Sequence, residues 1–382
     1  MNICLATSTF PANPDDAAHA AFLLEVIRVI ESRGHRVSVL TQVREPTSSP
    51  PLPSLDVVWF PWLKLGDRLA ELTFGSMEGA LSAASLVANG VRHLRLVRKS
   101  RRIDAFLCAW MIPSGFYAYL DQVLFRSRVP YALWALGSDV NKYRSNDLIC
   151  NVLRRVAGRA AAVYADGYGL CDDVQSMTGR PCEFLPTFRS FRGAPITAPP
   201  EHTPKRFLFV GRHIAVKGID VLVDALIAMK NGGHDAYRVD FVGDGEMTPL
   251  LKNRIAAAGL SQRARFLGRL SDEALARAYS DTDCLVIPSR SESIPIVMSE
   301  ALQHGVPLIV SDVGDMGMLA RRYGLGEVVP SGDPDALARA LTKFIAKPWR
   351  LDDAQARELL SKLTFEGAAD RLLSRLEQLV VT

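Results

Sequence analysis

The sequence predicts an α/β protein made of two tandem, doubly wound, Rossmann-like domains that face a cleft. Three observations support this prediction. Short apolar runs alternate with helical stretches in both halves of the chain, a proline-rich segment separates the halves, and 382 residues are enough for two hydrophobic cores. We expect the first domain at 1–188, a linker at 189–204, the second domain at 205–364 and a final helix at 365–382.

The first half contains six runs that are continuously apolar rather than alternating, as in parallel strands buried on both faces. Between the first two runs, Leu23, Val26, Ile27 and Ile30 recur at helical spacing, and Gly34 supplies the stop. The chain therefore begins with a βαβ unit. The six strands are expected at 2–7, 36–41, 56–60, 104–110, 131–136 and 161–166.

The second half repeats this alternation after a stretch without periodicity. Residues 183–205 contain five prolines, which favours a linker between domains. Helical runs of about 10 to 15 residues then separate six further apolar runs, the spacing of a second doubly wound sheet. These strands are expected at 206–211, 237–243, 264–268, 284–289, 307–312 and 326–330.

The composition excludes several classes of protein. The chain is 48% apolar and 23% charged, without a run of about 18 uncharged apolar residues, so no membrane-spanning helix is expected. The first residues lack a basic segment and are typical of a strand rather than a signal peptide, which favours the cytoplasm. Six scattered cysteines without a C-x-x-C pair argue against zinc and disulfides, and a net charge of +4 is too small to indicate nucleic acid.

Two cations follow the first strand of the second domain. In "FVGRHIAVKG" (209–218), Arg212 and Lys217 lie between the strand and the next helix. A guanidinium and an ammonium at the carboxyl end of a strand suit a diphosphate, although two surface cations in a solvated loop would have the same sequence. Neither G-x-G-x-x-G nor a P-loop motif is present.

Two acids flank a short predicted helix in "SRSESIPIVMSEALQHG" (289–305). Pro295 is expected as the first residue of this helix and Gly305 as its stop. Glu292 then precedes the helix, whereas Glu300 lies about one and a half turns inside it. Free amides of the first turn fall between them and can hold phosphate, which leaves sugar hydroxyls as partners for the two carboxylates.

These motifs resemble the retaining nucleotide-sugar glycosyltransferases of family 4, which have the GT-B fold. The resemblance rests on "GRHIAVKG", "VGDGEMTPLL", the segment "RFLGRLSDEALARAYSDTDCLVIPSRSESIPIVMSEALQHGVPLIVSDVG" and the E-x7-E spacing, and it is most specific from about 206 to 314. It implies that the first domain binds the acceptor and the second the donor. It also implies that the last helix packs back on the first domain.

The resemblance assigns roles to residues of the second domain. Arg212 and Lys217 would neutralise the donor diphosphate, with help from Ser293 and Ile294. Glu292 would lie at the donor sugar and Glu300 at the ribose. The base and its pocket would be lined by Gly243, Gly245, Leu267 and Gly268. No cofactor is implied beyond a UDP- or GDP-linked sugar as donor, and no metal, since "DTD" (281–283) matches an ordinary turn between helix and strand. His304 is expected to cap the short helix.

The first domain departs from the family pattern. The Gly-Gly pair that the family has after the first strand is replaced by Ala17 and Ala18, and the histidines expected at the ends of the fourth and fifth strands are replaced by Leu107, Ala109 and Leu136. One interpretation is an active transferase in which Asp139 and Glu292 border the reacting carbon. The alternatives are a non-catalytic sugar-nucleotide-binding partner of a transferase and a nucleotide-sugar epimerase.

The expected partners are a nucleotide sugar and a saccharide or lipid-linked acceptor, in cell-surface polysaccharide or glycolipid synthesis. The basic run "VRHLRLVRKSRR" (91–102) and the aromatic run "VVWFPWLKL" (57–65) could seat the first domain on an anionic membrane at the inner face of the cytoplasmic membrane. A solvated helix face is the alternative reading of the basic run.

Overall fold

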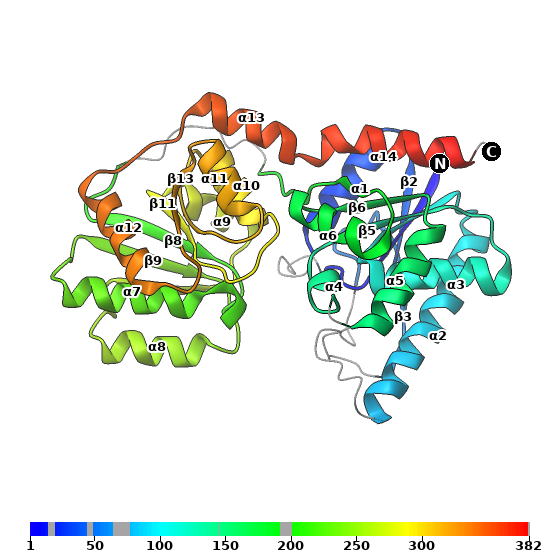
Figure 1. Cartoon of the computed structure of the whole chain (residues 1–382), viewed down its shortest axis with the longest axis horizontal. Coiled ribbons are helices and arrows are strands. Elements are labelled where there is room, and N and C mark those ends of the chain that lie inside the picture. The colour runs from blue at the N-terminus through cyan, green and yellow to red at the C-terminus, as the bar shows by residue number, and fades with distance from the viewer. Residues whose placement is uncertain (14–19, 44–48, 64–76, 145, 192–200, 381–382) are drawn as a thin grey trace. The chain divides into compact units, whose positions relative to one another are not determined.

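The computed structural model describes residues 1–382 except 14–19, 44–48, 64–76, 145, 192–200 and 381–382. The chain forms two compact units. The first contains Met1–Thr187 and Phe365–Thr382, and the second contains Phe188–Thr364. Each unit has a parallel sheet with helices (Figure 1), which confirms the predicted α/β class with two doubly wound sheets.

The first unit is built on seven parallel strands in the order β3-β2-β1-β4-β5-β6-β7. Strand β1 pairs with both β2 and β4, so the strand order reverses between β1 and β4, where parallel sheets usually bind ligands at their carboxyl ends. The strands are β1 (Asn2–Thr7), β2 (Arg36–Gln42), β3 (Asp56–Phe60), β4 (Ala105–Ala109), β5 (Tyr131–Ala135), β6 (Ala162–Ala165) and β7 (Glu183–Phe184).

The last helix of the chain completes the first unit. It packs against the first helix, and its apolar side chains Leu372 and Leu376 are fully buried. Arg33 donates hydrogen bonds to the carboxylate of Asp370 and to the carbonyl of Glu366. The helices of this unit are α1 (Phe22–Ser32), α2 (Met77–Ser100), η2 (Met111–Gly115), α3 (Phe116–Phe125), α4 (Ser138–Asn141), α5 (Asp147–Arg159), α6 (Tyr168–Thr178) and α14 (Phe365–Val380).

The second unit has six parallel strands in the order β10-β9-β8-β11-β12-β13. The order reverses between β8 and β11, where both predicted motifs begin. The strands are β8 (Lys205–Val210), β9 (Tyr237–Val242), β10 (Ala264–Gly268), β11 (Cys284–Ile287), β12 (Leu308–Ser311) and β13 (Gly326–Val329). The helices are η3 (Ala215–Lys217), α7 (Ile219–Asn231), α8 (Thr248–Ala257), α9 (Asp272–Ser280), α10 (Ile296–Gln303), α11 (Met316–Arg322), α12 (Pro334–Ala346) and α13 (Asp353–Leu363).

The boundaries differ from the predicted ones in two places. The short strand β7 extends the first sheet into the proline-rich segment, pairing with β6. The second unit already begins at Phe188, because Arg189 and Phe191 of the predicted linker are tied to it: the Phe191 N–H donates to Gln303 Oε1, and Gln303 Nε2 donates to the Arg189 carbonyl.

No helix within the described parts of the chain combines the length and the apolar character needed to cross a membrane.

Candidate functional site

The loops after β8 and β11 lie against each other at the reversal point of the second sheet. The Arg290 N–H donates to the Val216 carbonyl over 2.8 Å. Gly218 adopts φ +65° so close to Pro288 that a Cβ would lie 1.9 Å from the Pro288 carbonyl oxygen. Only glycine permits this approach, so these two loops form one continuous surface at the carboxyl edge of the sheet.

Lys217 and Glu292 meet where the two loops touch. The Lys217 Nζ donates to Glu292 Oε1 over 2.6 Å, and the Ser289 hydroxyl donates to the same oxygen over 2.8 Å. The Lys217 side chain is 27% exposed and that of Glu292 is 11% exposed, so the pair can be reached from solvent. Arg212 is exposed in the same β8 loop. The structure thus brings together the cation predicted for the diphosphate and the acid predicted for the sugar.

Helix α10 begins beside this ion pair. Pro295 has extended backbone angles, φ −70° and ψ 135°, and is the N-cap rather than the predicted first helical residue. Its ring fixes φ but its ψ is extended, so the helix starts one residue later, at Ile296. Ser293 and Ile294 precede the cap, at the end of the helix where the dipole is positive. The Ser293 hydroxyl is buried without a hydrogen-bond partner among the described residues.

Glu300 is buried inside the helix and held by two side chains. It is 2% exposed, and its Oε2 accepts a hydrogen bond from the hydroxyl of the fully buried Tyr279 over 2.7 Å. Its Oε1 lies 3.4 Å from Arg189 Nη1, and Arg189 also contacts the carboxylate of Asp272. Burial raises the pKa of Glu300, while Arg189 and Tyr279 act in the opposite direction. The carboxylate therefore has fixed partners within the second unit.

The sequence reasoning missed Arg189 and Tyr279. Arg189 belongs to the predicted linker. In the sequence, Tyr279 is not distinguishable from the apolar residues by which α9 packs on the core. A signal was present in Tyr279 itself, because a fully buried tyrosine needs a partner for its hydroxyl. His304, predicted as a capping group, is the C-cap of α10; its Nδ1 lies 2.9 Å from the Glu300 carbonyl, and burial lowers its pKa.

The residues predicted for the base lie along the same edge, after β9 and β10. The Gly243 N–H donates to the Gly268 carbonyl over 2.7 Å. A Cβ on Gly243 would lie 2.0 Å from the Gly211 carbonyl oxygen, and one on Gly245 would lie 2.5 Å from that of His213. The side chain of Leu267 is 37% exposed. These glycines bring the β9 loop against the β8 loop, so the predicted residues line one sheet edge from Leu267 to Glu292.

In the first unit, Asp139 joins two loops at the carboxyl edge of the sheet. It is 3% exposed; its Oδ2 accepts the Met111 N–H over 2.6 Å and its Oδ1 accepts the Leu136 N–H over 3.1 Å. Burial raises the pKa of Asp139 to about 6, and the backbone hydrogen bonds limit the rise. These contacts fix the ends of β4 and β5 relative to each other. The catalytic role of Asp139 remains a prediction.

The positions that lack the expected histidines belong to the core or its border. Leu107 and Ala109 are fully buried in β4, and Leu136 follows β5 and is partly buried. Apolar side chains here pack between sheet and helices, where an imidazole would need hydrogen-bond partners. Ala17 and Ala18 lie outside the described residues.

The "DTD" segment forms the predicted turn between α9 and β11. Asp283 accepts the Arg206 N–H over 2.8 Å and the His202 N–H over 3.1 Å. Asp281 is the C-cap of α9 and contacts Arg206. Both carboxylates thus fasten the start of the second unit to its sheet. In the described parts of the chain, no group of three His, Cys, Asp or Glu residues is arranged to hold a metal ion.

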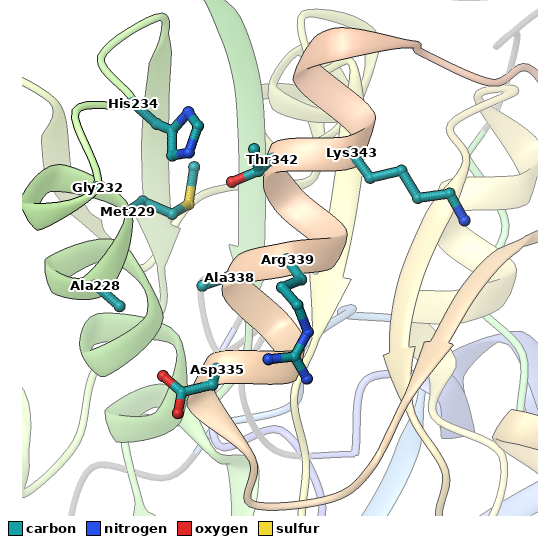
Figure 2. Close-up of a pocket in the computed structure, with 9 residues that line it drawn as sticks. All are labelled: Ala228, Met229, Gly232, His234, Asp335, Ala338, Arg339, Thr342 and Lys343. Carbon is teal, nitrogen blue, oxygen red and sulfur yellow. The ribbon is translucent and has the colours of Figure 1, made fainter.

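A separate pocket of about 490 Å³ lies between α7 and α12 (Figure 2). In the picture, Met229 and His234 come from the α7 side, whereas Ala338 and Thr342 come from α12 and Lys343 extends away from α7. No residue predicted for the donor lines it, so it is distinct from the sheet edge described above. Its lining residues are Ala228, Met229, Gly232, His234, Asp335, Ala338, Arg339, Thr342 and Lys343.

Comparison with known proteins finds a family match within the second unit. Residues 197–360 match the model of glycosyl transferases group 1. The chain is 29% identical over 268 residues to a putative teichuronic acid biosynthesis glycosyltransferase of Bacillus subtilis, covering 65% of this chain and 64% of that protein. It is 35% identical over 158 residues to a phosphatidyl-myo-inositol mannosyltransferase of Mycobacterium leprae, covering 41% of each. The chain thus spans less than two thirds of the length of these curated relatives.

Solved structures share the fold over the whole chain. A sucrose-phosphate synthase from Thermosynechococcus elongatus superposes with a TM-score of 0.79 at 19% identity, covering 100% of this chain and 99% of that one. The Anabaena protein HepE, in complex with UDP and glucose, superposes with a TM-score of 0.70 at 18% identity, covering 98% and 99%. The chain thus has the GT-B fold with its two doubly wound sheets, and residues 197–360 of its second unit match the glycosyl transferases group 1 model.

Proposed function

We propose that the protein is a retaining glycosyltransferase that moves a sugar from a UDP- or GDP-linked donor to a saccharide or lipid-linked saccharide. The second unit binds the donor and the first binds the acceptor. Cell-surface polysaccharide or glycolipid synthesis, in the cytoplasm at the inner face of the membrane, is the setting we propose. The names of the similar proteins from Bacillus and Mycobacterium agree with these substrate classes.

The observation that carries the proposal is the contact between Lys217 and Glu292 at the reversal point of the second sheet. A cation and a carboxylate 2.6 Å apart neutralise each other. A diphosphate offers Lys217 a more strongly charged partner, and sugar hydroxyls offer Glu292 hydrogen-bond donors. One extended ligand with a phosphate and a sugar therefore satisfies both groups, with the α10 dipole favouring its negative charge.

In the proposed reaction, the bond between the anomeric carbon and the diphosphate oxygen breaks while a bond to the acceptor oxygen forms on the same face of the sugar. The acceptor proton passes to the leaving diphosphate oxygen. Lys217 and Arg212 stabilise the charge that develops on this leaving group, the role that fixed cations have in such sites. Glu292 holds the donor sugar, and Glu300 accepts a hydrogen bond from the ribose.

We further propose that the reaction needs no metal ion, since two cationic side chains are available for the diphosphate. Turnover should then be unchanged by an excess of EDTA. A loss of turnover with EDTA that Mg²⁺ or Mn²⁺ restores would contradict this part of the proposal.

A second candidate function is a sugar-nucleotide-binding partner subunit without its own transfer activity. It is favoured by Asp139, because both of its oxygens already accept backbone N–H groups and the imidazoles expected near it are absent.

Calorimetry and turnover assays distinguish these functions. The purified protein is titrated with UDP-glucose, UDP-N-acetylglucosamine and GDP-mannose, and donor consumption is then followed with and without a lipid extract. A transferase binds one donor and consumes it when an acceptor is present. Binding without turnover under every acceptor condition would favour the partner subunit.

Substitutions in the two acids test the site itself. Glu300→Ala should weaken binding of the free nucleotide, and Glu292→Ala should chiefly lower transfer. If both variants kept the donor affinity and rate of the wild type, the proposed site would be wrong.

A further inference from the structure

The segment 188–191 leads into the second unit and is attached to α10 through its backbone. Gln303 Nε2 donates to the Arg189 carbonyl over 2.8 Å, and Gln303 Oε1 accepts the Phe191 N–H over 3.1 Å. Gln303 lies three positions after Glu300, so both side chains leave the same face of the helix. These contacts therefore hold Arg189 beside Glu300 without any use of the Arg189 side chain.

The side chain of Arg189 is shared by two acids. Its Nη1 lies 3.4 Å from Glu300 Oε1, and its Nη2 donates to the carboxylate of Asp272 at the start of α9. The guanidinium also lies against the ring of Phe191, with its Cζ 5.5 Å from the ring centroid. Arg189 is 14% exposed and Asp272 is 61% exposed, whereas Glu300 is buried. A nearly buried cation thus connects an exposed acid to a buried one.

The two oxygens of Glu300 have different surroundings. Oε2 accepts a short hydrogen bond from the hydroxyl of Tyr279, which is fully buried. Oε1 has only the longer contact with Arg189. Each oxygen of a carboxylate can accept about two hydrogen bonds, so Oε1 keeps capacity for a further donor. A hydroxyl of a ligand would therefore be bound by Oε1, the oxygen that Arg189 approaches.

The charge of Glu300 depends on its neighbours. Burial raises its pKa, and the positive charge of Arg189 is the strongest influence in the opposite direction, followed by the hydrogen bond from Tyr279. Asp272 acts in the same direction as burial. His304, whose Nδ1 lies 2.9 Å from the Glu300 carbonyl, faces the same environment. Arg189 and Asp272 therefore influence the charge of Glu300 with opposite signs.

We propose that Arg189 is a positioning residue of the donor site, which directs Glu300 Oε1 toward the ribose of a nucleoside diphosphate and holds its negative charge. An ionised oxygen binds a hydroxyl more strongly than a neutral one does. The inference rests on the proposed function, because it requires that Glu300 binds the ribose. Attachment of the segment 188–191 does not explain the side chain, since Gln303 already holds the backbone and the exposed Asp272 could bind Arg189 alone.

Calorimetry of the full chain with UDP and with GDP, between about pH 5 and about pH 8, tests the inference. Arg189→Met should weaken binding of the accepted nucleotide about tenfold at neutral pH, the low end for a hydrogen bond to a charged group, because the contact is long. As the solution is acidified, the fall in affinity should begin at a higher pH than in the wild type. Arg189→Lys keeps the charge and should restore most of the affinity and the wild-type pH profile.

Asp272→Asn should have the opposite effect on the pH profile. It leaves the charge of Arg189 to Glu300 alone, so the fall in affinity should begin at a lower pH than in the wild type. His304 is unchanged in all these variants, so its titration contributes equally to each profile. A role of Arg189 in structure alone would weaken binding alike at every pH.

Arg263→Met is the matched control. Like Arg189, Arg263 contacts an exposed aspartate, Asp235, and lies over an aromatic ring, that of Tyr237, at 5.7 Å from Cζ to the centroid. It directly precedes β10, at the amino edge of the sheet and away from the donor loops. This variant should bind the nucleotide like the wild type at every pH. Urea unfolding of each variant shows separately how far its stability has changed.

A second ligand tests whether the ribose hydroxyls are involved. The dideoxy form of the accepted nucleotide carries neither hydroxyl, so Glu300 Oε1 has nothing to bind. It should bind to the wild type and to Arg189→Met with the same affinity. If Arg189→Met weakened the binding of both nucleotides equally, Arg189 would only support the fold of the site.

The inference is also wrong if Arg189→Met binds the nucleotide like the wild type at every pH, or if Asp272→Asn and Arg189→Met shift the pH profile in the same direction. Asp272→Asn changes an exposed side chain, so its profile decides the matter even where Arg189→Met does not fold. In these cases the wild type still binds UDP or GDP and the proposed function stands. A wild type that binds neither nucleotide would overturn the proposed function and the inference together.

Discussion

Replacing Tyr279 by Phe tests the buried environment of Glu300. The substitution removes one hydroxyl from a fully buried ring and leaves Glu300 Oε2 without its 2.7 Å donor. The remaining partner, Arg189 Nη1, lies 3.4 Å from the other oxygen, too far to compensate fully. A hydrogen bond to a charged group contributes about 1.5–3 kcal/mol, so we expect the second unit to lose about 2 kcal/mol of unfolding free energy at neutral pH.

The loss should depend on pH in a defined direction. Tyr279 opposes the rise of the pKa of Glu300, so its removal raises this pKa further. A carboxyl whose pKa is raised by folding contributes stability below its unfolded pKa and loses it as the pH rises through the folded pKa. Tyr279→Phe therefore destabilises most where Glu300 is ionised, and the difference from the wild type shrinks in acid. If ionised Glu300 binds the ribose, the affinity for UDP should fall as the solution is acidified, and this fall should begin at a higher pH in the variant than in the wild type.

Tyr237→Phe is the matched control. Tyr237 is buried in the same unit, but its hydroxyl donates to the Leu226 carbonyl over 3.2 Å, and its charged neighbour Arg263 keeps the same charge at pH 5 and pH 8. This variant should lose about 1 kcal/mol, equally at pH 5 and pH 8, with unchanged pH dependence of UDP binding. Urea unfolding followed in the second unit and calorimetry with UDP measure both effects. Equal losses in the two variants at both pH values, with no shift in UDP binding, would refute the reasoning.

The other predictions concern the loops. Lys217→Gln removes a charge-assisted contact and should weaken UDP-sugar binding at least about tenfold in calorimetry. Glu292→Gln should lower turnover and leave the affinity for the UDP-sugar intact. Wild-type affinity in the first variant together with wild-type turnover in the second would contradict the site. Gly218→Ala should lower the free energy of unfolding in urea by at least about 3 kcal/mol, because its Cβ would overlap the Pro288 carbonyl. Gly179→Ala is the control. There φ is +71° and the space is open, so the loss should be only about 1–2 kcal/mol. Burial raises the pKa of Asp139 from 3.8 to about 6, so its stabilising contribution is present below about pH 4 and is lost as the pH rises through 6. The unfolding free energy of the wild type, relative to that of Asp139→Asn, should accordingly fall by about 2 kcal/mol from pH 4 to pH 7, and a constant difference would contradict this.

Local patterns were sufficient to predict the sheets. The run at 2–7 coincides with β1, because a parallel strand covered on both faces is apolar at nearly every position. The two-residue strand β7 was missed, since so short a segment carries no periodicity. Pro295 was placed one residue too far into its helix, because sequence alone does not distinguish extended from helical ψ at a proline.

The sequence indicated which loops carry the candidate site, but not every contact within it. Glu292 and Glu300 stand in one motif, and the pairing of Lys217 with Glu292 follows from two loops at one sheet edge. By contrast, Arg189 approaches Glu300 across 111 residues of sequence, and no periodicity records such a contact. The hydrogen bonds of Asp139 could not be predicted either. Its partners are the backbone N–H groups of Met111 and Leu136, and a backbone N–H is present whatever the side chain of the residue is.

The return of α14 to the first unit has a consequence for synthesis of the chain on the ribosome. Phe365 packs against Trp134, and Leu372 and Leu376 are fully buried, so the first core lacks this layer until α14 has been made. All of Phe188–Thr364 has been synthesised by then. The first unit is therefore completed after the second, and the second unit is in effect an insertion that can fold while its host is still unfinished.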